Sequence, residues 1–191
     1  MSLDVALNDD GKLLLPENLS IDGGLYLADA SITSLPGNLV VNGGLYLGSS
    51  TIRSLPENLT VRGNLDLSGT AIRLLPKTLS VGGGLNLSRS AIRSLPANFS
   101  VGGYLDLSDT SMTSLPDNLT VGSALDLSDS AIRYLPDNLT VGGFLDLRGT
   151  AIKSLPRSLV VGGDIKLSRS VVLNGAKVGG NVYQVPLSWT A

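Results

Sequence analysis

Apolar residues recur along this chain at a fixed interval of twenty residues. Copies of one pattern, such as LPDNLTVGSALDLSDSAIRY, begin at Leu15, Leu35, Leu55, Leu75, Leu95, Leu115, Leu135 and Leu155. We number the positions of each copy from this leading Leu. Positions 1, 5, 7, 11, 13 and 18 are apolar in all eight copies, and nothing is inserted or deleted between copies. A fixed period in this range is typical of a solenoid, so the sequence predicts a single domain of stacked coils.

The spacing of the apolar positions predicts strands rather than helices. Positions 5 and 7, and positions 11 and 13, each skip one residue, which is the alternation of a half-buried strand. We therefore expect a short strand at positions 5–7 and a longer one at positions 10–14. The invariant Pro at position 2 places one corner there, and glycines such as Gly142 and Gly143 at positions 8 and 9 place a second.

Stacking such coils in parallel would align identical residues in columns. Position 4 is Asn in six copies and Thr78 or Ser158 in the others, and position 16 is Ser or Thr in seven copies. These side chains favour turns and can bond to nearby backbone groups. We expect ladders in which they cap the backbone of the same or the next coil, although simple turn preference would select the same residues.

The segment LDLRGTAIKSLP at 145–156 follows the pattern LxL–xx–T–x–I–xx–LP. This pattern resembles the short bacterial leucine-rich repeat that carries a Leu-Pro step, over roughly residues 3–174. That repeat occurs in secreted effector proteins, including the leucine-rich-repeat domains of bacterial ubiquitin ligases. The resemblance implies a leucine-rich-repeat solenoid of parallel strands that recognises a target protein. It also implies a bacterial protein that stays in the cytoplasm or is secreted into a host cell.

The chain departs from that family in two ways. The Asn that follows the LxL strand in the family is Ser or Thr here, as at Thr150. The return segment NLTVGG is also more strand-like than the usual convex side of such repeats. We therefore expect a β-rich solenoid of eight regular coils with terminal caps, flattened towards a parallel β-helix.

The two ends of the chain depart from the regular pattern. Residues 1–14 are interpreted as an N-terminal cap coil, residues 15–174 as the eight repeats and residues 175–191 as a C-terminal cap. In the last segment the Leu-Pro corner is skipped and Val178-Gly179-Gly180 repeats the glycine corner three residues early. We expect Val182, Val185, Leu187 and Trp189 to cover the open end, with a frayed tail cut from a longer chain as the alternative.

Composition excludes several kinds of chemistry. The 191 residues include neither Cys nor His, which removes thiol catalysis, Cys/His metal sites and Ser-His catalytic pairs. A ubiquitin ligase that depends on cysteine would need a further domain. The net charge of −2 does not favour nucleic acid, and no apolar run is long enough to span a membrane. We expect a monomer without a cofactor or metal.

A partner would recognise the variable outward positions. Position 12 points outwards between two inward Leu residues, and position 10 carries two aromatic residues in a column of mostly small ones. These columns supply the candidate binding residues Tyr26, Tyr46, Asp66, Tyr104, Asp106, Asp126, Phe144 and Asp146. Like charges one coil apart repel by roughly 1 kcal/mol, so the Asp column suggests a basic partner or a divalent cation. The opposing explanation is that a tolerated Asp was duplicated with the repeat.

Position 19 forms a separate basic column with Arg53, Arg73, Arg93, Arg133 and Lys153. It could bind an acidic partner, but we interpret it as balancing the Asp column and discouraging aggregation. The favoured function is a non-enzymatic scaffold for protein–protein interaction. The alternative is a module that binds polysaccharide or a cell surface through the Tyr and Asp columns. An enzyme built on the Asp residues is disfavoured, because a repetitive surface without long loops offers no pocket that excludes water.

Overall fold

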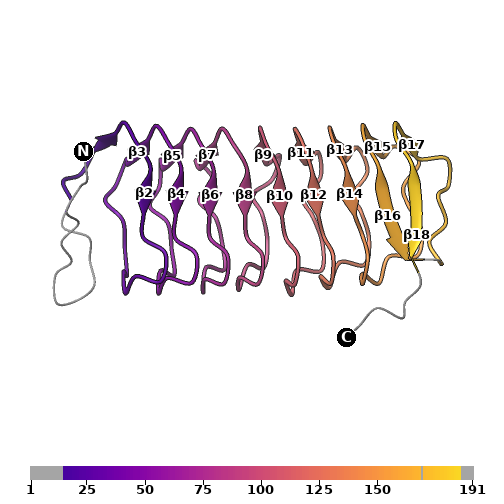
Figure 1. The fold of residues 1–191 in the computed structure, drawn as a ribbon, viewed down its shortest axis with the longest axis horizontal. Coiled ribbons are helices and arrows are strands. Elements are labelled where there is room, and N and C mark those ends of the chain that lie inside the picture. The colour runs from indigo at the N-terminus through magenta and orange to yellow at the C-terminus, as the bar shows by residue number, and fades with distance from the viewer. Residues whose placement is uncertain (1–14, 169, 186–191) are drawn as a thin grey trace.

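The computed structural model describes residues 15–168 and 170–185, and these residues form a parallel β-solenoid. The chain forms about eight coils of twenty residues. Figure 1 shows these coils side by side along the longest axis of the molecule. None of the described residues is helical, and none lies in a helix that could cross a membrane. The predicted fold class, a solenoid of parallel strands, is therefore confirmed.

One side of every coil contributes to a continuous nine-stranded sheet. Neighbouring strands pair in parallel with a shift of one repeat, so that Leu105 lies opposite Leu125 and Asp106 opposite Asp126. The strands are β2 (Leu25–Tyr26), β4 (Leu45–Tyr46), β6 (Leu65–Asp66), β8 (Leu85–Asn86), β10 (Leu105–Asp106), β12 (Leu125–Asp126), β14 (Leu145–Asp146), β16 (Ile165–Ser168) and β18 (Val182–Val185).

The second side of the coils carries two shorter sheets instead of one. The first contains β1 (Ser20–Ile21), β3 (Val40–Val41), β5 (Thr60–Val61) and β7 (Ser80–Val81). The second contains β9 (Ser100–Val101), β11 (Thr120–Val121), β13 (Thr140–Val141), β15 (Val160–Val161) and β17 (Lys177–Val178). The break between β7 and β9 falls at the coil in which Phe99 replaces the usual Leu of position 5.

The strands are shorter than the alternation predicts. Strands of the regular coils occupy only positions 6–7 and 11–12, except that β16 has four residues. The expected longer strand at positions 10–14 is therefore wrong for most coils. The reason is a turn at positions 14 and 15, where residues such as Asp109 and Asp129 adopt a φ of 55° and end the strand.

The third side of each coil, at positions 16–20, contains almost no regular structure. Among the described residues it forms only two isolated parallel bridges, Leu74 with Ser94 and Ser154 with Val172. We call this the third side of the solenoid.

The core consists of apolar columns that run through the stack, as predicted. Leu125 and Leu127 at positions 11 and 13 are fully buried, while Asp126 between them lies on the outer face. Position 18 completes the interior with residues such as Ile132 and Met112. Each coil buries its apolar residues against the coils on either side, which is why one repeat cannot form a core alone.

The predicted side-chain ladders are also present. Position 4 carries Asn with a positive φ, as at Asn38 and Asn58, where the Asn58 Nδ2 donates to Asn38 Oδ1 at 3.0 Å. Thr78 and Ser158, which replace Asn at position 4, form a different hydrogen bond. Their hydroxyls accept from the backbone amides of Asn58 and Asn138 in the preceding coils. At position 16, buried hydroxyls such as Thr110 Oγ1 donate to the carbonyl three residues earlier, here Leu107 at 2.7 Å.

The described part of the C-terminal segment prolongs the stack. Val178 pairs with Val161, and the Gly180 amide donates to the Gly163 carbonyl, so the early glycine corner is in register. Strand β18 pairs with β16 and leaves Val182 and Tyr183 exposed. These residues add strand to the sheet instead of folding across its end. The expected N-terminal cap at 1–14, and Leu187 and Trp189, lie outside the described residues.

Candidate functional site

The outer face of the nine-stranded sheet carries all eight candidate binding residues. Six of them are the position 12 residues of β2, β4, β6, β10, β12 and β14, and their side chains point outwards because positions 11 and 13 point into the core. Tyr104 and Phe144 stand at position 10, directly before β10 and β14. The parallel register therefore brings residues from six coils of the chain onto one face of the sheet.

The Asp column has a structural task that the sequence analysis did not identify. Asp106 Oδ1 accepts hydrogen bonds from the Ser108 amide at 2.9 Å and from its hydroxyl at 2.7 Å. Asp126 makes the same two bonds to Ser128. A side chain that bonds the backbone two residues later caps a turn. The repeated Asp-Leu-Ser triplet was the signal that could have revealed this role.

Each of these turn bonds engages only one carboxylate oxygen. Asp66 Oδ1 accepts from the Ser68 amide at 2.9 Å, in the same way as the other Asp residues. The Oδ2 atoms of Asp66, Asp106 and Asp126 have no hydrogen-bond partner within the described part of the chain. These three carboxylates are half-buried, so each keeps one oxygen that an incoming donor can reach.

Asp146 differs from the other members of the column because it is only 1% exposed. Arg148 covers it with bonds to both oxygens, the shortest between Nη2 and Oδ2 at 2.7 Å, and Lys166 Nζ lies 3.7 Å from Oδ2. The carboxylate of Asp146 raises the pKa of Arg148 above its ordinary value, chiefly through this side-chain hydrogen bond. A partner at this end of the face would therefore meet Arg148 and Lys166 before it met Asp146.

Two aromatic residues at the N-terminal end of the face form a stacked pair. The ring centroids of Tyr26 and Tyr46 are 4.8 Å apart and the ring planes differ by 8°. The centroid separation equals the usual distance between neighbouring strands, so the stacking of coils sets the stacking of the rings. The glycines at position 10 leave room for these rings, because a Cβ on Gly44 would lie 2.7 Å from the Tyr46 ring.

Tyr104 lies near the middle of the face, where both acidic residues and another tyrosine influence its hydroxyl group. Its ring covers Gly84 of the preceding coil so closely that a Cβ there would overlap the ring. The pKa of Tyr104 is raised above its ordinary value of 10.0, first by burial and then by the charges of Asp66 and Asp106, with a contribution from Tyr46. We call Tyr46, Asp66, Tyr104 and Asp106 the Tyr104 cluster.

At the C-terminal end of the face, the ring of Phe144 contacts a cation. Lys166 Nζ lies over the Phe144 ring, 5.6 Å from its centroid, within the range of a cation–π interaction. The same ammonium group also forms an ion pair with the carboxylate of Asp146. The candidate residues thus fall into three groups along the sheet: the tyrosine stack, the Tyr104 cluster, and the group of Phe144 with Asp146 and its two cations.

The idea of a divalent cation on the Asp column finds no geometric support. Within residues 15–168 and 170–185, no three acidic side chains converge in a way that could hold a metal ion. Neighbouring strands pair with a shift of one repeat, so successive carboxylates stand in a row. Their hydrogen bonds to the turns keep them from converging on one point.

Comparison with known proteins does not extend this description. No protein-family model matches the chain, and no curated protein sequence matches it either. What stands is a parallel β-solenoid of twenty-residue repeats with Leu at fixed positions.

Proposed function

We propose that this chain is a non-enzymatic scaffold that binds another protein through the outer face of its nine-stranded sheet. The observation that carries the proposal is the Tyr104 cluster, in which a ring held over Gly84 shares the outer face with Asp66 and Asp106, whose charges raise its pKa. The finer proposal, a target-recognition module of a bacterial effector-like protein, rests on the resemblance of the LxL–xx–T–x–I–xx–LP pattern to bacterial leucine-rich repeats.

The chemistry of the cluster favours a partner surface with both basic and apolar side chains. Tyr104 is 37% exposed and already held in place over Gly84, so little side-chain entropy is lost when a partner covers it. Tyrosine is also enriched among residues that dominate binding energy. The unengaged oxygens of Asp66 and Asp106 can accept charge-assisted hydrogen bonds from Arg or Lys of the partner.

The same features argue for binding instead of catalysis. The Asp carboxylates of the column hold turns together, and they stand in a row on the outer face of the sheet. Catalysis by a carboxylic acid depends on a site that excludes water and holds the reacting atoms in place. A row of carboxylates along a sheet face suits an extended protein contact better.

Photo-crosslinking from position 104 tests the proposal. A benzoylphenylalanine in place of Tyr104 keeps an aromatic ring on the face, and the same residue in place of the exposed Tyr134 on the third side serves as the control. We expect a discrete protein to be captured from position 104 alone. Asp66→Asn combined with Asp106→Asn should reduce this capture at least tenfold, while the charge-matched pair Asp117→Asn and Asp137→Asn should not.

Equal capture from positions 104 and 134 would contradict the proposal. So would capture that persists undiminished in the Asp66→Asn/Asp106→Asn variant, since the carboxylates would then play no part in recognition.

A second candidate, polysaccharide binding on the same face, is favoured by the Tyr26–Tyr46 stack. Tyr26 is 73% exposed, and exposed tyrosine rings can pack against sugars. The two rings, however, cover part of each other, which reduces the ring surface open to a ligand. Binding to a glycan array that is lost on Tyr26→Ala/Tyr46→Ala, and unaffected by Asp66→Asn/Asp106→Asn, would favour this candidate over the protein scaffold.

A further inference from the structure

The third side of the solenoid carries a column of cations without partners. We call Arg53, Arg73, Arg93, Arg133 and Lys153, all at position 19, the basic column. All five side chains are exposed, and none makes a hydrogen bond or ion pair with another side chain of the described residues. Positions 16–20 contain no acidic residue in any of the eight copies. Among the described residues, the column therefore forms no ion pair with the Asp residues of the other face.

Two hollows lie on this column at equivalent positions of the repeat. One, of about 220 Å³, is lined by Arg133, Tyr134, Ala151, Lys153 and Ser154. The other, of about 410 Å³, is lined by Arg53, Ser54, Ala71, Arg73 and Leu74. In both, positions 19 and 20 of one coil and positions 17, 19 and 20 of the next form the lining. The two sites are four coils apart, which is roughly 19 Å at the usual strand spacing.

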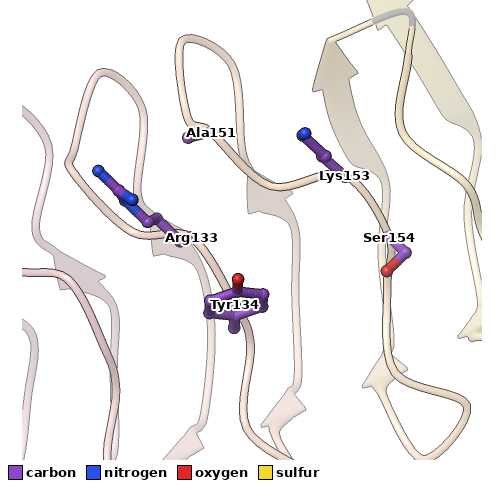
Figure 2. A pocket seen from close by; sticks show the side chains of 5 residues that line it. All are labelled: Arg133, Tyr134, Ala151, Lys153 and Ser154. Atoms are coloured by element: carbon purple, nitrogen blue, oxygen red, sulfur yellow. The ribbon is translucent and has the colours of Figure 1, made fainter.

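Each hollow combines the same three chemical features. Figure 2 shows Arg133 and Lys153 extending from neighbouring coils, with Ala151 between them and Tyr134 and Ser154 at the lower edge. Ala at position 17 leaves the space open, and two cations flank it. One large apolar side chain stands at position 20 of each site, Tyr134 in one and Leu74 in the other, and both are largely exposed, at 77% and 64%.

We infer that the third side binds an acidic polysaccharide, with one sugar unit seated in each hollow. The paired cations would bind carboxylate or sulfate groups of the polymer through charge-assisted hydrogen bonds. The apolar side chain at position 20 would pack against the sugar ring, and Ser154 or Ser54 would bond its hydroxyls. The hollows are near or below the lower end of the range of about 300–1,000 Å³ that holds drug-sized ligands, which suits single sugar units.

The spacing of the column distinguishes this ligand from other polyanions. Cations one coil apart are separated by about 4.8 Å, whereas alternate side chains of an extended acidic peptide are roughly 6.7 Å apart. Single-stranded nucleic acid requires aromatic platforms for successive bases, and Tyr134 is the one aromatic residue at positions 16–20 of the eight copies. Each unit of an acidic polysaccharide carries a charge beside a ring, and each of the two hollows places cations beside an open space and an apolar side chain.

Direct binding measurements with the whole chain test the inference. The probes are polygalacturonate and heparin as acidic polysaccharides, dextran as a neutral one, and poly-glutamate and poly(dT) as other polyanions. We expect an acidic polysaccharide to bind, dextran not to bind, and affinity to fall as salt rises. Arg133→Gln/Lys153→Gln and Arg53→Gln/Arg73→Gln should each weaken binding about tenfold. The charge-matched Arg62→Gln/Arg157→Gln variant, with both substitutions outside the column, should bind as the wild type.

Variants that fill the hollows with larger side chains distinguish a binding site of defined shape from unspecific electrostatic attraction. Ala151→Leu and Ala71→Leu keep every charge and lie on exposed positions, so they should fold normally and yet weaken binding several-fold. If these two variants and Tyr134→Ala bind as well as the wild type, only unspecific attraction remains and the inference is overturned. Tighter binding of poly-glutamate or poly(dT) would overturn it in favour of an acidic protein or a nucleic acid. Asp66→Asn/Asp106→Asn should leave polysaccharide binding unchanged, which keeps this test independent of the proposed protein-binding face.

Discussion

Phe99 and Leu79 occupy the same position in neighbouring coils, and the short strands that follow them do not pair. Leu79 is 9% exposed and Val81 beside it 7%, whereas both equivalent residues of the preceding coil are fully buried. A Phe ring is larger than the Leu side chain that this column otherwise stacks, so it separates the two coils locally. The nine-stranded sheet continues past this point without a break.

Replacing Phe99 by Leu should therefore join the two short sheets. We expect slower amide hydrogen exchange at Ser100 and Gly102, because their N–H groups would gain carbonyl partners in the coil of Leu79. The lost ring burial and the gained hydrogen bonds offset each other, so the free energy of unfolding should change by less than about 1.5 kcal/mol. Phe144→Leu on the outer face is the control and should leave these amides unchanged. Unchanged exchange in Phe99→Leu would show that the ring does not cause the break.

Gly122→Ala should destabilise the solenoid, because a Cβ there would overlap the carbonyl oxygen of Gly102 in the preceding coil. Backbone on both sides would have to move, and we expect a loss of about 1–3 kcal/mol in the free energy of unfolding. Gly23→Ala is the matched control, since a Cβ added there would have nothing within 4 Å and its φ lies outside the left-handed region. Denaturant unfolding of the two variants would measure the difference. Equal stability would mean that the glycine corner can relax at no cost.

Asn118→Ala and Asn118→Gly test the two tasks of position 4 separately. Asn118 has a φ of 56° and its Nδ2 donates to Asn98 Oδ1 at 3.2 Å. Ala loses this bond and also opposes the positive φ, whereas Gly loses only the bond. We expect Ala to lower the free energy of unfolding by about 1 kcal/mol more than Gly does. If thermal unfolding ranks the two variants in the opposite order, the backbone conformation is not what selects Asn.

The raised pKa of Tyr104 gives a measurable dependence on pH. Because the folded-state pKa lies above 10.0, the unfolded chain releases this proton first as pH rises. The contribution of Tyr104 to stability is thus present below pH 10.0 and is lost as pH rises through the higher folded-state value. Absorbance titration of the phenolate, taken as the difference between wild type and Tyr104→Phe, would give the pKa. Asp66→Asn/Asp106→Asn should lower it towards 10.0, and no change would place the carboxylates too far away to act.

The twenty-residue period was enough to predict the solenoid, its columns and the outward position of the candidate residues. Alternation alone could not give strand lengths, because the turn at position 15 depends on residues with positive φ, such as Asp109 and Asp129. The repeated Asp-Leu-Ser triplet could have predicted the role of Asp106 in a turn. The negative charge of the column drew attention to ligand binding instead. Burial of Asp146 depends on Arg148 and Lys166 from two different coils, a contact that no short-range pattern contains.

The order of coils matters even though their sequences are so alike. At position 8 the first three copies carry Asp22, Asn42 and Arg62, while the later ones carry glycine, starting with Gly82. From that point a Cβ would meet the carbonyl oxygen of the coil before it. A duplication that inserted a copy of the third coil after the sixth would place the Arg side chain in that contact. We therefore expect a copy of one of the first three coils to destabilise the solenoid when it is inserted among the later five.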